Sequence, residues 1–163
     1  LIPKISLNTK NVIRMRTFSK AYGMAGLRVG YAIGEKELIL NFEKIRNHFG
    51  MSRVSQVGAL AALEDNEFIS KVVNKVELTR NRIADIASRN NCKFIPSFTN
   101  FVAIDCLSDS KFAKRVLDNL INKGVFVRMP YSYPQNRCIR VTVGLDKDID
   151  LFEKYFPIAL EES

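Results

Sequence analysis

Apolar residues recur along the chain at spacings that predict a series of helices and short strands. The clearest pattern follows the N-cap pair Asp65-Asn66, where apolar positions repeat near every 3.6 residues and predict a helix to about Ser88. Shorter patterns predict helices over 35–47, 54–63, 111–123 and 149–160, and Gly124 is expected to end the helix over 111–123. Runs of extended-favouring residues predict strands over 11–18, 27–33, 93–95, 100–106, 125–128 and 138–143. Among the helices, 54–63 is rich in Ala and Leu and is expected to be buried.

The order of these elements predicts an α/β protein in two parts. Residues 1–65 hold two strands and two helices, too few to close a sheet of their own, so we interpret them as part of a larger domain. Residues 66–163 alternate helix and strand, which predicts one small sheet covered by helices on one side.

Charge and hydropathy limit the kinds of molecule that the protein is expected to bind. The 163 residues carry a net charge of +8, but the basic residues are scattered and match no zinc-finger or RNA-binding signature. We therefore favour an anionic small molecule over nucleic acid. No apolar run approaches the roughly 18 residues of a membrane span, and no signal peptide is visible, so we expect a cytoplasmic protein without a membrane partner.

Cysteine and histidine are too sparse for the common metal sites and for a serine-protease-like triad. Cys92, Cys106 and Cys138 form no CxxC pair, and His48 is the only histidine. We expect reduced, mostly buried thiols and no metal. The chemistry must then rest on Lys, Arg, Tyr, Ser or carboxylates.

The segment 17–31 gathers groups suited to a phosphate and a carbonyl. The hydroxyls of Thr17 and Ser19 precede Lys20, and Arg28 follows within a glycine-rich stretch. Hydroxyls and a guanidinium can cradle a phosphate, and a partly desolvated lysine beside it can form a Schiff base. The glycines follow the lysine, which excludes a Walker P-loop, and their spacing GxxGxxxG excludes the dinucleotide fingerprint.

This segment resembles the fold-type I pyridoxal-phosphate (PLP) aminotransferases, and specifically their histidinol-phosphate aminotransferase-like branch. The [ST]-x-S-K signature reads Thr17-Phe18-Ser19-Lys20, and the G-x-R-x-G pattern reads Gly26-Leu27-Arg28-Val29-Gly30. The resemblance continues through three later stretches, 55–63, 97–101 and 127–144. It implies the PLP-transferase fold, with 1–65 from the large cofactor-binding domain and 66–163 as the small C-terminal domain.

The resemblance also implies roles for individual residues. Lys20 would hold PLP covalently and then act as the base that moves the substrate proton, while Thr17, Ser19 and Arg28 would bind the cofactor phosphate. Arg140 would bind the anionic group of the substrate; the alternative is a distant carboxylate partner within the chain. Arg128 resembles a second anion-binding arginine, although a surface charge at a strand end fits equally well.

The implied reaction is amino transfer between an anionic amino donor, such as histidinol phosphate or an aromatic amino acid, and a 2-oxo acid, in a homodimer. The resemblance also implies further site elements before Leu1, so we expect this chain alone to be a fragment that transaminates poorly. A PLP-dependent decarboxylase of a phosphorylated amino acid remains an alternative, as does a catalytically incomplete interaction module.

Overall fold

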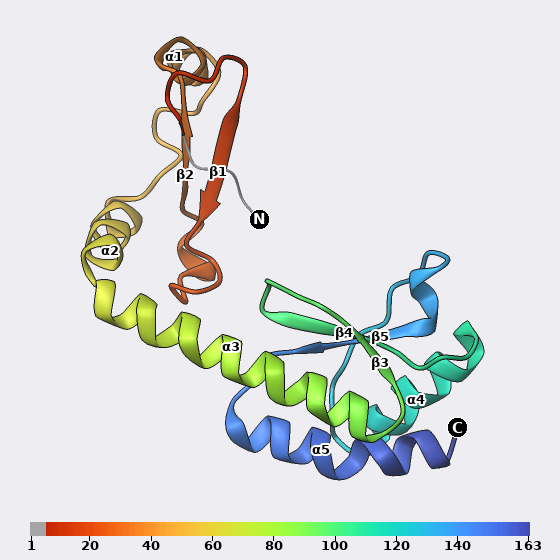
Figure 1. The fold of residues 1–163 in the computed structure, drawn as a ribbon. Helices are drawn as coiled ribbons and strands as arrows, with labels where there is room; N and C mark the ends of the chain where they lie inside the picture. Colours follow the sequence, from red (N-terminus) through yellow and green to blue (C-terminus); the bar gives the residue numbers. More distant parts are fainter. Residues whose placement is uncertain (1–5) are drawn as a thin grey trace. The chain divides into compact units, whose positions relative to one another are not determined.

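The computed structural model describes residues 6–163, which divide into two compact units, one ending at Val73 and the other spanning Asn74–Ser163. The division falls inside the long helix α3 (Asn66–Arg89), the yellow-green helix of Figure 1. The domain boundary predicted between residues 65 and 66 lies at the start of this helix, and it stays a prediction. Within residues 6–163, no helix is both long and apolar enough to cross a membrane.

The first unit is built on an antiparallel hairpin. Strand β1 (Ile13–Thr17) pairs with β2 (Gly30–Gly34) from Ile13 opposite Gly34 to Thr17 opposite Gly30. A single 3₁₀ turn, η1 (Ala25–Leu27), precedes β2. The strand predicted over 27–33 therefore starts three residues late, because Leu27 closes the 3₁₀ turn and Arg28 takes a left-handed backbone with φ of 50°.

This unit also holds two helices, α1 (Lys36–Glu43) and α2 (Arg53–Glu64), and the first part of α3. The prediction that 54–63 is a buried helix is right about the helix and wrong about its burial. Val54 and Val57 are each 69% exposed, and only Ser55 and Ala59 of α2 are buried. The reason is the small size of the described core of this unit, which consists of Phe18, Val29 and Ala59 with partly buried neighbours.

The second unit holds one antiparallel sheet, ordered β3 (Lys93–Ile95), β4 (Phe101–Asp105), β5 (Cys138–Thr142). The later part of α3 packs on one face of this sheet with α4 (Ser110–Asn122) and α5 (Asp146–Glu161) (Figure 1). This confirms the predicted sheet with helices on one side. A 3₁₀ turn, η2 (Gln135–Arg137), leads into β5.

Strand alternation decides which side chains enter the core of the second unit. Ile139 and Val141 of β5 lie in the core with residues of α3, α4 and α5, whereas Arg140 between them lies on the other face. Helix ends follow the predicted signals: Asp65 Oδ1 accepts the Phe68 N–H, and Gly124 ends α4 with φ of 79°. The predicted strand over 125–128 is wrong, because only Arg128 makes a β-bridge there.

Candidate functional site

The three predicted phosphate-binding residues, Thr17, Ser19 and Arg28, lie at one end of the β1–β2 hairpin. Beyond the Thr17–Gly30 pair, the Phe18 N–H donates to the Val29 carbonyl at 3.3 Å, and Ser19 and Arg28 are the next residues beyond Phe18 and Val29. The Thr17 hydroxyl donates to the Ser19 hydroxyl at 2.9 Å and accepts the Ser19 N–H at 3.1 Å.

Backbone geometry explains the glycine-flanked arginine. Arg28 has the left-handed φ of 50°, and its Nη1 donates to the Ala25 carbonyl at 2.7 Å. Gly30 lies so close to β1 that an added Cβ would stand 2.6 Å from the Arg16 carbonyl oxygen. Glycine at position 30 is therefore what allows the two strands to approach beside Arg28.

Phe18 anchors the segment that carries Lys20. Its side chain is 2% exposed, and its ring lies 4.9 Å from that of Tyr22 and 5.6 Å from that of Tyr31. A turn follows in which the Gly23 N–H donates to the Lys20 carbonyl at 2.9 Å. The Lys20 side chain is exposed, and within residues 6–163 its ammonium has no hydrogen-bond or ion-pair partner.

The chemistry of this donor set fits a phosphorylated cofactor. Two neighbouring hydroxyls and a guanidinium are the groups that proteins commonly use to bind phosphate oxygens. Thr17, Ser19 and Arg28 supply them at one end of the hairpin, next to an exposed primary amine on Lys20. The residues present thus suit a ligand that joins a phosphate to a carbonyl group, and the roles of individual residues stay predictions.

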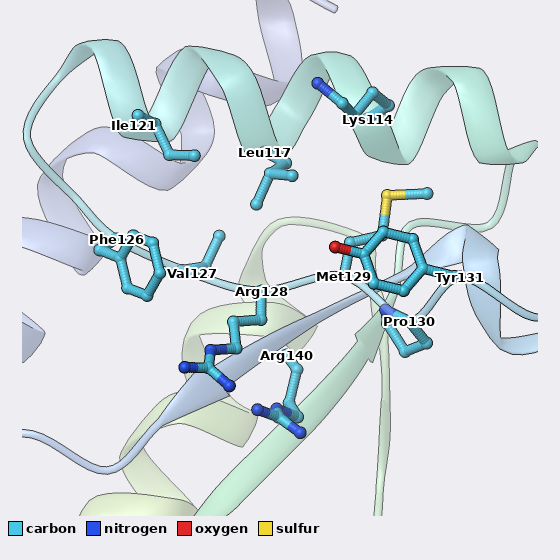
Figure 2. Close-up of a pocket in the computed structure, with 10 residues that line it drawn as sticks. All are labelled: Lys114, Leu117, Ile121, Phe126, Val127, Arg128, Met129, Pro130, Tyr131 and Arg140. Atoms are coloured by element: carbon cyan, nitrogen blue, oxygen red, sulfur yellow. The ribbon is translucent and has the colours of Figure 1, made fainter.

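The second unit brings Arg128 and Arg140 directly opposite each other. The Arg128 N–H donates to the Arg140 carbonyl at 3.1 Å, and the Arg140 N–H donates to the Arg128 carbonyl at 2.6 Å. Residues paired in this way project their side chains to the same side of the ladder. Figure 2 shows the two guanidinium groups side by side.

No carboxylate neutralises this pair within the described residues: none of the ion pairs there involves Arg128 or Arg140. Arg140 Nε is buried without a hydrogen-bond partner, and its guanidinium lies 4.9 Å from the centre of the Phe101 ring. Arg140 lies on the sheet face away from the helices, because Ile139 and Val141 on either side of it enter the core. The Nε atom of Arg140 is therefore buried on this outer face of the sheet and not in the core.

Sequence reasoning missed Phe101. It is two residues before Ala103, which pairs with Arg140, so the alternation of β4 puts Phe101 on the same face as the arginine. The alternation of β4 could have identified Phe101 only if the pairing register of β4 with β5 had been known.

A cavity of about 620 Å³ lies between α4 and the segment after it (Figure 2). Its wall on α4 is formed by Leu117 and Ile121 with the stem of Lys114, and Arg128 and Arg140 line another part. The remaining lining residues are Phe126, Val127, Met129, Pro130 and Tyr131. The cavity therefore combines an apolar wall with two guanidinium groups. In the part of the chain that the structure describes, no group of three His, Cys, Asp or Glu side chains could hold a metal.

Comparisons with known proteins agree on one family. The model of the family described as aminotransferase class I and II matches residues 4–151. Histidinol-phosphate aminotransferase from Aliarcobacter butzleri is 38% identical over 145 residues, which are 88% of this chain and 39% of that protein. The enzyme of the same name from Bacillus pumilus is 42% identical over 135 residues, 83% of this chain and 36% of its own. The chain thus spans about two fifths of the length of these curated relatives.

Solved structures give the same result. The crystal structure of histidinol-phosphate aminotransferase from Sinorhizobium meliloti in complex with pyridoxal-5'-phosphate matches with a TM-score of 0.89 and 44% identity, covering 95% of this chain and 42% of that one. This likeness confirms the predicted α/β fold of the PLP transferases. The L-threonine-O-3-phosphate decarboxylase of Porphyromonas gingivalis matches with a TM-score of 0.75 at 18% identity, covering 94% of this chain and 48% of that one. That match concerns the fold alone.

Proposed function

This chain belongs to the class I and II aminotransferase family, and we propose that the protein containing it uses pyridoxal phosphate to transfer an amino group from an anionic donor to a 2-oxo acid. We further propose that the donor carries a phosphate, as histidinol phosphate does, with an aromatic amino acid as the second choice. The observation that carries the donor class is the pair Arg128–Arg140, two opposed guanidinium groups without a carboxylate partner among the described residues.

The cofactor would be held by the hairpin end. Thr17, Ser19 and Arg28 would bind its phosphate through two hydroxyls and one guanidinium, and Gly30 would keep the backbone close enough for them to converge. Pyridoxal phosphate, when bound, supplies a carbonyl that accepts the amino group and a ring that withdraws electrons from the substrate Cα. Lys20 would hold the cofactor through Nζ and then move the proton at the substrate Cα.

The substrate would be held by the second unit. Like charges placed directly opposite each other destabilise a β-ladder, so this pair is unfavourable unless an anion bridges it. A phosphate or carboxylate matches two planar guanidinium groups with several charge-assisted hydrogen bonds. The apolar wall of the adjoining cavity, with Leu117, Ile121 and Phe126, would accept the ring of an imidazole or aromatic donor.

A second copy of the chain is the partner we propose. Exposed apolar side chains gather on the segments around α1 and α2, where Ile45 is 83% and Phe49 96% exposed. Apolar surface of this kind favours association. We propose that the complete protein is a homodimer, which sedimentation of the complete protein would test, and its location in the cytoplasm stays a prediction.

The test is a panel of amino donors offered to the complete protein with pyridoxal phosphate and a 2-oxo acid. We expect phosphorylated donors to give a new amino acid from the 2-oxo acid and an oxo product from the donor, without release of CO2. Release of CO2 in proportion to donor consumed would favour the decarboxylase alternative. Equal turnover of neutral and anionic amines would contradict the role given to the arginine pair.

A further inference from the structure

Two of the three cysteines lie opposite each other at one end of the small sheet. Strand β3 pairs with β4 up to Lys93 opposite Asp105, and Cys92 and Cys106 are the residues that directly flank this last pair, so continuing the register by one residue would set them opposite each other. Cα atoms of directly opposed antiparallel residues are about 4.5–5.5 Å apart, within the roughly 4.4–6.8 Å that a disulfide needs. The backbone thus holds the two cysteines in a geometry that a disulfide can adopt.

The side chains of this pair also meet. Cys106 is 8% exposed in the core of the second unit, and Cys92 is partly buried and packs against that core. A hydrogen bond between the two thiols lowers the pKa of Cys92, while the same bond and burial raise the pKa of Cys106. Cys92 is the more accessible of the two thiols, as a first reacting thiol should be.

Cys138 does not compete for this position. It pairs with Asp105 in the register of β5 with β4, so it lies on the sheet face opposite to Ile139 and Val141, which enter the core. Cys106 belongs to the core cluster. The alternation of the strand thus separates Cys138 from the pair, although all three thiols are free in the structure.

We propose that Cys92 and Cys106 form a reversible dithiol–disulfide site that reacts with hydroperoxides. The Cys92 sulfur attacks one oxygen of hydrogen peroxide; an S–O bond forms, the O–O bond breaks, and the thiol proton leaves with the departing hydroxide as water. The Cys106 sulfur then attacks the Cys92 sulfur; the S–S bond forms, the S–O bond breaks, and a second water carries away the Cys106 proton. Two thiols are oxidised and one peroxide is reduced.

The experiment treats the complete protein with hydrogen peroxide, quenches it in denaturant with an alkylating reagent, and maps the peptides by mass spectrometry. We expect a cross-linked peptide joining Cys92 to Cys106, released by dithiothreitol, with Cys138 alkylated throughout. Cys138→Ser, the matched control, should give the same cross-link, and Cys92→Ser should abolish it. Cys106→Ala should also abolish it, and circular dichroism will show whether this buried substitution still folds.

A second measurement does not depend on the buried variant. Because the disulfide would close a loop between β3 and β4, the oxidised wild type should unfold at a higher temperature than the reduced protein, and Cys92→Ser should show no such rise. A cross-link that includes Cys138, or complete alkylation of both Cys92 and Cys106 after peroxide treatment, would overturn the proposal. So would irreversible oxidation of Cys92 while Cys106 stays a free thiol.

Discussion

Arg128 and Arg140 exchange both of their backbone hydrogen bonds, Arg128 N–H to the Arg140 carbonyl at 3.1 Å and Arg140 N–H to the Arg128 carbonyl at 2.6 Å. This pairing is the single β-bridge that the segment after α4 makes within the described residues. It fixes the two guanidinium groups on one side of the ladder without an acidic partner there. This arrangement supports the proposal that the pair binds a ligand with negative charge, because the protein itself gains little from two adjacent cations.

The role of Lys20 is tested by covalent labelling. Borohydride treatment of the complete protein with pyridoxal phosphate should fix the cofactor on the peptide that contains Lys20, since its primary amine is exposed beside the hydroxyls of Thr17 and Ser19. Peptide mass mapping gives the position. Lys36→Ala, which changes another exposed lysine of the same unit, should leave labelling unchanged, and Lys20→Ala should remove it. Labelling mainly at a different lysine would contradict the assignment of Lys20 as the residue that holds the cofactor.

Gly30 and Gly26 form a matched pair of glycines within one motif. In Gly30→Ala the new Cβ would meet the Arg16 carbonyl at 2.6 Å, so β1 and β2 must separate; the overpacking should cost about 1–3 kcal/mol of unfolding free energy. In Gly26→Ala the Cβ meets nothing within 4 Å, and stability should hold or rise slightly. Urea unfolding of the complete protein measures both.

The same two variants separate stability from cofactor binding. Because Gly30 is next to the residues that carry the phosphate-binding groups, Gly30→Ala should also weaken retention of pyridoxal phosphate, measured by absorbance after dialysis. Gly26→Ala should retain it. Equal loss of cofactor in both variants would mean that the close approach of the strands is irrelevant to the site.

The acidic residue Glu153 of α5 links two arginines of α3. It pairs with Arg82 and, at 2.5 Å, with Arg89, and the bond from Arg82, followed by that from Arg89, lowers the Glu153 pKa. A carboxylate whose native pKa lies below its unfolded value, about 4.3, stabilises the fold above that value and loses this contribution as the pH falls through the native pKa.

Glu153→Gln should therefore lower the unfolding temperature at neutral pH, with the difference from wild type shrinking as the pH falls below about 4. Glu161→Gln, which changes an exposed glutamate on the same helix, serves as the control and should have little effect at any pH. Thermal unfolding across the pH range measures this. If the difference in unfolding temperature between Glu153→Gln and the wild type stayed constant at acidic pH, the pair of Glu153 with Arg82 would not depend on the ionisation of Glu153.

Local signals in the sequence predicted most elements of the fold. The N-cap at Asp65 and the glycine at 124 gave the correct ends of two helices, because capping depends on residues a few positions apart. The burial of 54–63 was predicted wrongly, since an apolar pattern says which face can be buried and not what covers it. Residues 125–128 likewise have strand-forming side chains, but only Arg128 finds a bridging partner.

The candidate site divides in the same way. The segment from Thr17 to Arg28 is continuous, so its groups could be identified from spacing, although the left-handed backbone at Arg28 could not. The opposition of Arg128 and Arg140 and the contact of Arg140 with Phe101 depend on pairing between strands distant in sequence. Register of this kind is set by packing of the whole sheet, which no local pattern encodes.

Substitution of Arg140 tests whether the arginine pair recognises an anion. A hydrogen bond to a charged group contributes about 1.5–3 kcal/mol, so Arg140→Ala in the complete enzyme should lower kcat/KM for a phosphorylated donor by roughly ten- to two-hundred-fold. Arg140→Lys should recover only part of this, because an ammonium keeps the charge without the planar fork. Arg115→Ala, at an exposed arginine of α4 that donates to the Ser163 carbonyl at 3.0 Å, is the matched control and should leave kcat/KM unchanged.

The decisive comparison uses a neutral amine of similar shape, whose turnover should be affected much less by Arg140→Ala. If kcat/KM fell equally for the two substrates, Arg140 would have a structural role through its contact with Phe101 and would not bind the anion.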